Sequence, residues 1–455
     1  MANEAPARRV PVAAALTVAA AAAAFCTLYF VSRLFQAGPN AAILAAVIAL
    51  SLERRRARQP GRGMGFELAD ILVVAGGAGL VAWLLHAHLL LGAAVFTAGL
   101  TLAVWLRRFG GNAKLLGGML TLPFVAALVA PGAPHATSGR GADLLLVLLA
   151  ALAAFLWDWA LHALARPAGF GQARARIAVS EVAAPVREPG KLTASDRMAA
   201  QMAAALTAAF VIGILTFPQH WSWVVLTAFI VCSGAIGRGD AAYKGVLRLS
   251  GALAGAAVAA AMQYLFLPQG PAAALLIFAA LFIGLWLRES NYAWWAGSMT
   301  LVVALLAPAG TGAGFLAERL LAIFLGAVCG VAACWFVLPI RTRSMVRRRL
   351  ADALLALEEL AGTDGAEREQ KLRSFQHRAT ECERIAPPLR WHRRFAGSDE
   401  DHPAAWLEVM RACAGKPPAA PDPELVKAVR LSRRALKEGQ GLTPALRRVQ
   451  TVLEA

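Results

Sequence analysis

Long apolar runs separated by short polar segments dominate the chain up to about residue 340. A helix that crosses a membrane needs roughly 17–25 mostly apolar residues. That window finds candidate spans at residues 10–35, 38–52, 66–86, 87–106, 112–131, 143–163, 199–217, 221–237, 245–266, 270–287, 291–309 and 316–338. The pattern predicts an all-α, polytopic membrane protein with about twelve transmembrane helices, of which the second and eighth are short.

The predicted spans form two similar halves. The motif Trp-Leu-Arg at residues 105–107 ends the fourth span and recurs at residues 286–288, where the tenth span ends. Asn112, at the start of the fifth span, likewise recurs as Asn291 in the eleventh. Six spans in each half predict a parallel repeat, related by an axis along the membrane normal. We therefore expect a substrate route between the two halves.

The composition changes abruptly after Pro339, where charged residues become frequent. Apolar residues recur at helical spacing in segments such as 344–362 and 423–438. A polar segment with Pro and Gly separates the two halves. The predicted domains are a first transmembrane repeat (1–165), a cytoplasmic linker (166–198), a second transmembrane repeat (199–340) and a helical cytoplasmic domain (341–455).

The composition supports a membrane protein, and the charge distribution predicts its orientation. The chain is 58% hydrophobic and only 16% charged, whereas about a quarter of the residues in soluble domains are charged. A net charge of +17 suggests a nucleic-acid partner, but 20 of the 23 Lys and Arg within residues 1–340 fall on one side if the N-terminus lies inside. The positive-inside rule explains this excess without nucleic acid and predicts cytoplasmic N- and C-termini.

The sequence contains no motif of an enzyme or of a cofactor site. It has no phosphate loop of Walker type, no Gly-x-Ser-x-Gly and no Cys or His pair at metal spacing. The six cysteines form no framework, so we expect reduced thiols. The apolar run from Val10 to Phe35 is longer than that of a signal peptide. We therefore expect that the first span is not cleaved. Because the motifs named above are missing, we also expect no catalytic residues, cofactor or metal.

Charged residues within the spans are candidates for function, because each costs at least about 2.5 kcal/mol at mid-membrane unless it faces a partner or water. Asp70 and Asp158 are either proton-coupling residues or residues at headgroup level. Arg248 follows Lys244 by four residues, so both lie on one helix face. They either collect anions at the inner mouth of a pore or are ordinary snorkelling residues.

The second half contains further candidates near its helix ends. Arg319 either pairs with its neighbour Glu318 or meets an organic anion. Tyr292 and Trp294 begin the eleventh span. They belong to an aromatic belt at the membrane interface or stack against an aromatic substrate.

The last candidates are two asparagines at corresponding positions of the two halves and two pairs of glycines. Asn112 and Asn291 either cap helix starts or line the route. Glycines four residues apart permit close contact between membrane helices. We expect such helix packing at Gly251, Gly255, Gly326 and Gly330.

Several elements occur in a characteristic order in the second half. They are Trp223 with Leu226-Thr227-Ala228, Arg248-x2-Gly251-x3-Gly255, Asn291-Tyr292 with Thr300, and Glu318-Arg319 with Gly326. This order resembles the fusaric acid resistance-type module of the aromatic acid exporter family. The resemblance covers 199–340 well and, through the repeat, 38–165 weakly. It departs from the family at Ala252, where Thr is usual, and in its short linker, where many exporters carry a large cytoplasmic domain.

The resemblance implies a bacterial inner-membrane efflux transporter for aromatic or other organic carboxylic acids, coupled to the proton gradient. Substrate-binding candidates are then Lys244, Arg248, Asn291, Tyr292, Trp294, Thr300, Arg319 and Asn112. The plant aluminium-activated malate transporters, which are anion channels, have a similar six-helix unit, so an organic-anion channel stays an alternative. A non-transporting membrane scaffold that acts through 341–455 is a third possible function. The expected partners are a small organic anion and the lipid bilayer, with a homo-oligomer or a periplasmic adaptor as further partners.

Overall fold

The computed structural model shows an all-helical chain, as the sequence predicts. It describes residues 5–34, 40–58, 64–110, 140–165, 192–235, 237–265, 270–288, 290–306, 312–340, 342–396, 402–438 and 441–454, with scattered residues between 113 and 128. No strand occurs among these residues. The chain divides into two compact units, which we describe separately. Unit 1 comprises Met1–Ser233 and Lys244–Ala333, and unit 2 comprises Gly234–Tyr243 and Cys334–Ala455.

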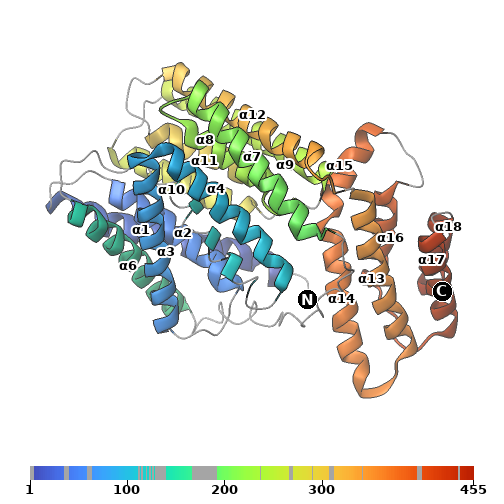
Figure 1. Cartoon of the computed structure of the whole chain (residues 1–455). Coiled ribbons are helices and arrows are strands. Elements are labelled where there is room, and N and C mark those ends of the chain that lie inside the picture. Colours follow the sequence, from blue (N-terminus) through green and yellow to red (C-terminus); the bar gives the residue numbers. More distant parts are fainter. Residues whose placement is uncertain are drawn as a thin grey trace. The chain divides into compact units, whose positions relative to one another are not determined.

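Unit 1 contains the apolar helices, drawn from blue to light orange in Figure 1. Its earlier elements are α1 (Ala5–Leu34), α2 (Asn40–Arg58), α3 (Met64–Ala87), α4 (Leu89–Trp105), the short 3-10 helix η1 (Leu106–Phe109) and α6 (Arg140–Ala165). Its later helices are α7 (Ala194–Thr216), α8 (Trp221–Cys232), α9 (Arg238–Leu265), α10 (Gly270–Leu287), α11 (Tyr292–Leu306) and α12 (Gly312–Phe336). The first residues of α9 and the last of α12 are counted with unit 2.

Many of these helices are apolar enough to lie in a membrane. Within the described residues, the helices long enough to cross one are Val12–Leu34, Leu89–Phe109, Ala194–Thr216, Arg238–Leu265 and Gly314–Phe336. Shorter apolar helices are Ala41–Leu50, Ile71–Ala87, Leu148–Leu164, Trp221–Cys232, Ala272–Leu287 and Tyr292–Leu306. Each predicted span except 112–131 overlaps one of these helices, and much of 112–131 lies outside the described residues.

Small side chains let the first helices approach one another closely. On α2, Ala42, Ala45 and Ala49 recur at intervals of three and four residues and are fully buried. One face of α2 is therefore nearly flat, and α1 and α6 pack against α2 and against each other. Membrane helices associate through such faces because lipid tails are as apolar as the side chains, so close van der Waals packing has to supply the attraction.

Two aromatic contacts join the earlier helices to the later ones. Phe96 of α4 meets Phe210 of α7 edge to face, with ring centroids 5.5 Å apart. Phe25 of α1 meets Phe278 of α10 in the same manner at 5.9 Å. Edge-to-face pairs contribute beyond the area they bury because the positive ring edge meets the negative ring face. These pairs lie within the packed contacts of α4 with α7 and of α1 with α10.

Glycines bring α9 and α11 into backbone contact. A Cβ atom at Gly251 would lie 2.3 Å from the carbonyl oxygen of Ala293, and one at Gly255 would lie 2.2 Å from that of Gly297. The contact positions advance together along both helices, so α9 and α11 run parallel. Any larger residue at either glycine would force the two backbones apart.

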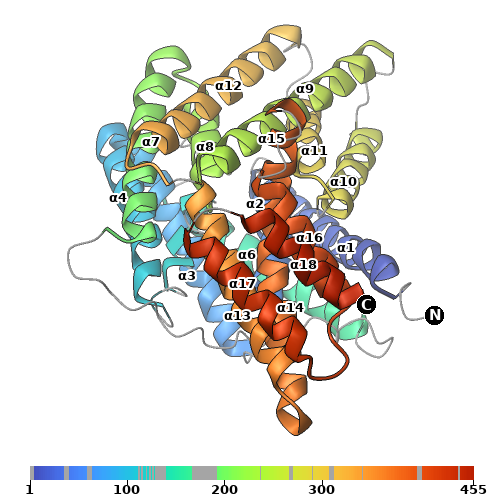
Figure 2. The same cartoon turned by 90° about the vertical axis from the view of Figure 1, so that its right-hand side faces the viewer.

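A second pair of glycines does the same for α8 and α12. A Cβ atom at Gly326 would lie 2.4 Å from the carbonyl oxygen of Val224, and one at Gly330 would lie 2.8 Å from Cβ of Val231. These helices also run parallel, and they lie side by side in both Figure 1 and Figure 2. The α8–α12 contact therefore depends on the absence of side chains at these two positions.

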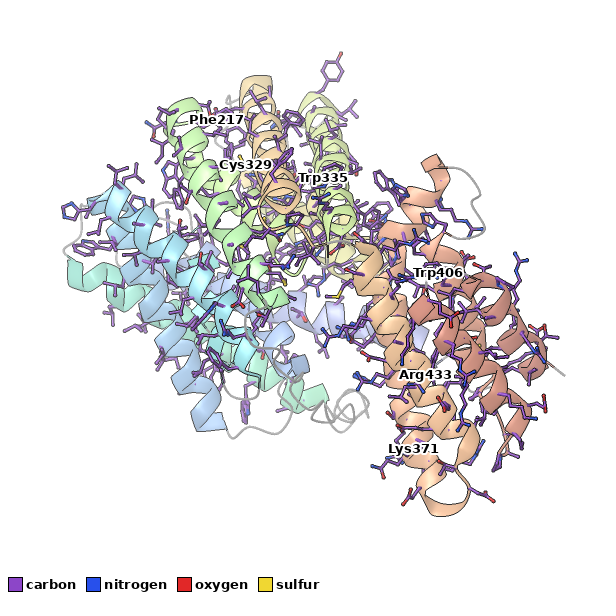
Figure 3. All side chains as sticks on the ribbon, turned by 45° about the vertical axis from the view of Figure 1, so that its right-hand side comes forward. Phe217, Cys329, Trp335, Lys371, Trp406 and Arg433 are labelled. Atoms are coloured by element: carbon purple, nitrogen blue, oxygen red, sulfur yellow. The ribbon has the colours of Figure 1, made fainter. Side chains whose placement is uncertain are left out.

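Unit 2 is a helical bundle with its own core. Its helices are α13 (Thr342–Gly362), η2 (Gly365–Glu367), α14 (Arg368–Arg384), α15 (Ala386–Ala396), α16 (Pro403–Gly415), α17 (Pro423–Glu438) and α18 (Leu442–Glu454). Leu350, Leu354 and Leu357 of α13 are fully buried, as are Phe375 of α14 and Leu407 of α16. Arg433 and Trp406, labelled in Figure 3, belong to α17 and α16 of this bundle.

An ion-pair cluster ties α13 to α17. Glu358 of α13 accepts hydrogen bonds from Arg430 Nε at 2.8 Å and from Arg433. Desolvation by burial raises the pKa of Glu358, but the hydrogen bonds and charges of the two arginines outweigh it and hold that pKa below its ordinary value. The ionised carboxylate therefore stabilises the folded bundle.

The first prediction concerns the α9–α11 contact. We expect Gly255→Ala to lower the stability of the purified protein by about 1–3 kcal/mol, because the added methyl group overpacks a backbone contact. Gly79→Ala is the matched control, since no described atom lies within 4 Å of a Cβ at Gly79 on α3. That change should be neutral or stabilising by up to about 1 kcal/mol. Thermal unfolding in detergent measures both, and equal melting temperatures for the two variants would contradict the prediction.

The second prediction concerns Glu358. At pH 7, Glu358→Gln should lower the free energy of local opening of α13 and α17 by about 1–2 kcal/mol. Because the folded pKa is lowered, the wild-type contribution is complete above the unfolded carboxyl pKa of about 4.3 and is lost as pH falls through the folded value. Hydrogen exchange of peptides from both helices measures the effect.

The control for this measurement is Glu424→Gln, which removes an exposed pair with Lys427. An exposed pair contributes less than about 1 kcal/mol, so exchange should barely change. Unaltered protection of α13 in Glu358→Gln at pH 7 would show that the cluster does not stabilise the bundle.

Candidate functional site

Two arginines lie buried within unit 1. Arg248 of α9 is 4% exposed and Arg319 of α12 is 5% exposed. They lie close enough for their charges to repel each other. Among the described residues neither arginine has a carboxylate partner, and the Nε atom of each is buried without a hydrogen bond. Two like charges in a low-dielectric interior without a counter-charge are costly, so this place favours an anion.

The helix contacts explain why both arginines are buried. Arg248 precedes Gly251 and Gly255 by three and seven residues, so it lies on the face of α9 that packs against α11. Arg319 precedes Gly326 by seven residues, which places it on the face of α12 that packs against α8. The close helix contacts therefore enclose both guanidinium groups instead of leaving them at the lipid surface.

Aromatic rings surround Arg319. Its guanidinium carbon lies 5.0 Å from the ring centroid of Trp223, within the range of a cation–π interaction. The imidazole of His220 stacks on the same indole, with centroids 4.2 Å apart and ring planes 16° apart. Phe315 meets the indole edge to face at 5.3 Å. The rings partly offset the charge of Arg319 without neutralising it.

His220 also joins α8 to α12 through an acidic residue. Its Nδ1 atom lies 2.8 Å from Oε1 of Glu318. Of the two alternatives for Arg319, pairing with Glu318 or contact with an organic anion, the first is not observed, because Glu318 pairs with His220. Sequence reasoning also missed His220, and its one available signal is its position between Pro218 and Trp221 at the start of a short apolar helix.

Buried hydroxyl groups lie on the same helices. Thr227 of α8 is fully buried, and its Oγ1 atom has no hydrogen-bond partner among the described residues. A Cβ atom at Gly326 would lie 2.8 Å from that of Thr227, so Thr227 faces α12. Thr300 of α11 is also fully buried and donates to the carbonyl oxygen of Ala296 in its own helix at 3.0 Å. The hydroxyl group of Thr227 therefore lies between α8 and α12 without a described hydrogen-bond partner.

The other candidates of the second half have local roles. Lys244 Nζ lies 3.4 Å from the carbonyl oxygen of Ser233, at the C-terminal end of α8. Asn291 caps α11, since its Oδ1 atom accepts the backbone N–H of Ala293 at 2.9 Å. Tyr292 is half-buried in the first turn of α11, whereas Trp294 is 53% exposed. These positions are compatible with helix capping and an interfacial aromatic residue.

The structure describes only part of the candidates in the first half. Asp158 of α6 is fully buried, and its carboxylate lies 3.4 Å from His162 Nδ1, one turn further along the helix. Asp70 belongs to α3, but its side chain lies outside the described residues, and Asn112 lies outside them altogether. The residues that the structure brings together are thus Arg248 and Arg319.

These features define a multi-pass membrane protein with a buried cationic site. Residues 198–333 match the family described as "Fusaric acid resistance protein-like". The matched region, which includes Arg248 and Arg319, is therefore similar to that family, and the resemblance seen in the sequence is confirmed. The match supports a membrane transport or resistance protein. Neither the curated proteins nor the solved structures compared with the chain give a match.

The third prediction follows from the unneutralised charge. Arg319→Met should stabilise the protein without ligand by about 1–4 kcal/mol, because an apolar chain of similar volume replaces a buried charge. Arg288→Met is the control, since Arg288 is only half-buried and lies 5.9 Å from the ring centroid of Trp295. Melting temperatures in anion-poor buffer test the difference. A lower melting temperature for Arg319→Met would show that the charge is already compensated.

Proposed function

We propose that this protein exports aromatic or other organic carboxylic acids across the inner membrane of a bacterial cell, coupled to the proton gradient. The observation that carries the proposal is the burial of Arg248 and Arg319 without a described carboxylate partner. A carboxylate between them would supply the missing counter-charge, and guanidinium groups bind carboxylates through strong, charge-assisted hydrogen bonds. The aromatic cluster of Trp223 and Phe315 beside Arg319 suits an anion that carries an aromatic group.

The proposed architecture has twelve spans in two parallel six-helix repeats, with a cytoplasmic domain after residue 340. The order of helices supports it, because the six helices α7 to α12 follow the described helices α1 to α4 and α6 of the first half. The contacts α4–α7 and α1–α10 also support it, since each joins the first helix of one set to the fourth of the other. A twofold axis along the membrane normal would relate two such contacts. With cytoplasmic termini, α8 and α12 begin at the outer side of the membrane.

In this proposal the arginines act together with the other candidate residues of the sequence. Arg248 and Arg319 hold the carboxylate, while Lys244 keeps the inner end of α8 in place. Tyr292, Thr300 and the two amides at Asn112 and Asn291 line the path, and Asp70 or Asp158 takes up the coupling proton. A homo-oligomer or a periplasmic adaptor would complete the route.

The fourth prediction tests the anion site. Uptake of radiolabelled benzoate into everted membrane vesicles with an imposed proton gradient should fall at least about tenfold in Arg248→Gln, because a charged hydrogen bond contributes about 1.5–3 kcal/mol. Protein levels should not change. The control is Arg288→Gln, which should transport normally. If the wild-type protein takes up no aromatic acid when a proton gradient is imposed, the proposal is wrong.

Electrical recording in planar bilayers separates this function from the organic-anion channel. A channel gives a steady anion current without a proton gradient, and its current would depend on the same two arginines. A scaffold that acts through 341–455 would give neither current nor uptake.

A further inference from the structure

A titratable pair lies next to the buried arginine site. His220 and Glu318 are in hydrogen-bond contact at 2.8 Å, and their side chains are 32% and 35% exposed. Both therefore reach solvent or the membrane interface, where protons can exchange. Histidine is the side chain whose charge ordinarily changes between about pH 5 and pH 8.

The pair is physically continuous with Arg319. His220 stacks on Trp223, and Arg319 lies 5.0 Å from the centroid of the same indole. Phe315 contacts both rings, at 5.9 Å from the imidazole and 5.3 Å from the indole. Glu318 directly precedes Arg319 on α12. A change of charge at His220 or Glu318 therefore acts on Arg319 over a short distance.

No other described charge intervenes in the elements packed around His220. From α12, Glu318 contacts it, and Arg319 contacts Trp223, on which His220 stacks. The turn at residues 217–219 and the last two turns of α7 at residues 210–216 contain no ionisable side chain, and the rest of α8 contains only Cys232 at its far end. Phe217, labelled in Figure 3, ends α7 at this place. Among the described residues, the electrostatic potential at this place thus depends on the charges of His220, Glu318 and the arginines.

We infer that His220 and Glu318 form a proton-binding site whose occupancy strengthens anion binding at Arg248 and Arg319. With His220 neutral, the free charge of Glu318 offsets part of the positive potential at Arg319. With His220 protonated, the imidazolium neutralises Glu318, and the full potential of both arginines acts on the anion. Because linkage is reciprocal, a bound anion also raises the proton affinity of the pair. The inference rests on the proposed function, since it assumes that an anion binds between the arginines.

The site differs from the carboxylates proposed for proton coupling. Asp70 and Asp158 belong to α3 and α6, whereas this pair joins α8 and α12. Its effect also has a fixed sign, because any proton gained near the arginines makes the site more positive. Under the proposed topology the pair lies toward the outer side, so acid outside retains the anion and neutral medium releases it.

The test uses the purified full-length protein in detergent with benzenesulfonate as the probe, because this aromatic anion stays ionised at every pH used. Binding is measured by calorimetry at about pH 5.5 and about pH 8, on either side of the ordinary histidine range. The wild-type protein should bind the probe at least about fivefold more tightly at the lower pH, the lower end of typical coupling between two sites.

Two variants give opposite results if the inference is right. His220→Gln leaves Glu318 permanently charged, so binding should lose its pH dependence and match the weaker wild-type value at about pH 8. Glu318→Gln removes the offsetting charge, so binding at that pH should become tighter than in the wild-type protein. His86→Gln is the matched control. His86 is an exposed histidine whose Nδ1 atom contacts only the carbonyl oxygen of Ala82 in its own helix among the described residues, so that variant should keep the full pH dependence.

The outcomes separate this inference from the proposed function. Binding that is equally tight at both pH values in the wild-type protein overturns the inference alone, as does pH dependence retained in His220→Gln. If that variant does not fold, Glu318→Gln decides, and unchanged or weaker binding in it at about pH 8 overturns the inference. Absence of binding of benzenesulfonate and benzoate at both pH values overturns the anion site, and this inference with it.

Discussion

The constraint on which the rest of this structure depends is the burial of two guanidinium groups within unit 1. Removing a charge from water costs several kcal/mol even after a protein relaxes around it. Arg248 and Arg319 bear that cost near each other, and the ring of Trp223 offsets only part of it. Under the proposed function, such a site would gain free energy when an anion enters. The unfavourable burial is thus the source of affinity, and the remainder of the bundle has to hold the two charges in place.

The glycine contacts provide this restraint. Gly251 and Gly255 fix α9 on α11, and Gly326 fixes α12 on α8, each through contacts too close for a larger residue. Both arginines lie on these packed faces, so neither can turn toward lipid or water without opening a helix contact. Alanine-rich helices elsewhere in unit 1 pack by the same means. Small residues therefore do more than allow close packing. The contacts that they permit also hold the side chains of Arg248 and Arg319 in the interior of unit 1.

The sequence predicts the helices and the arginines well but predicts their partners poorly. Membrane thickness fixes the length of an apolar run, and a charge within such a run stands out, which is why α9, α12, Arg248 and Arg319 could be identified. Their proximity could not be predicted, because it depends on how distant helices pack. Pairing of Glu318 with Arg319 is one of the two alternatives that the sequence leaves open, yet consecutive residues of a helix do not face each other. The observed partner of Glu318, His220, is 98 residues away and lies outside every apolar run.

The sign of the charge at the site constrains how transport can be driven. An elementary charge gains about 2.3 kcal/mol per 100 mV of membrane potential, so an inside-negative potential alone pulls a carboxylate outward. Arginines lower the barrier to this movement by replacing the water that the anion loses. A proton bound beside the arginines would have the opposite effect, because it makes the site more positive and holds the anion there. A proton that drives export must therefore bind where the field of the arginines is weak. Under the proposed function, Asp158, buried beside His162 on α6, is the described candidate for such a proton that lies outside α8 and α12.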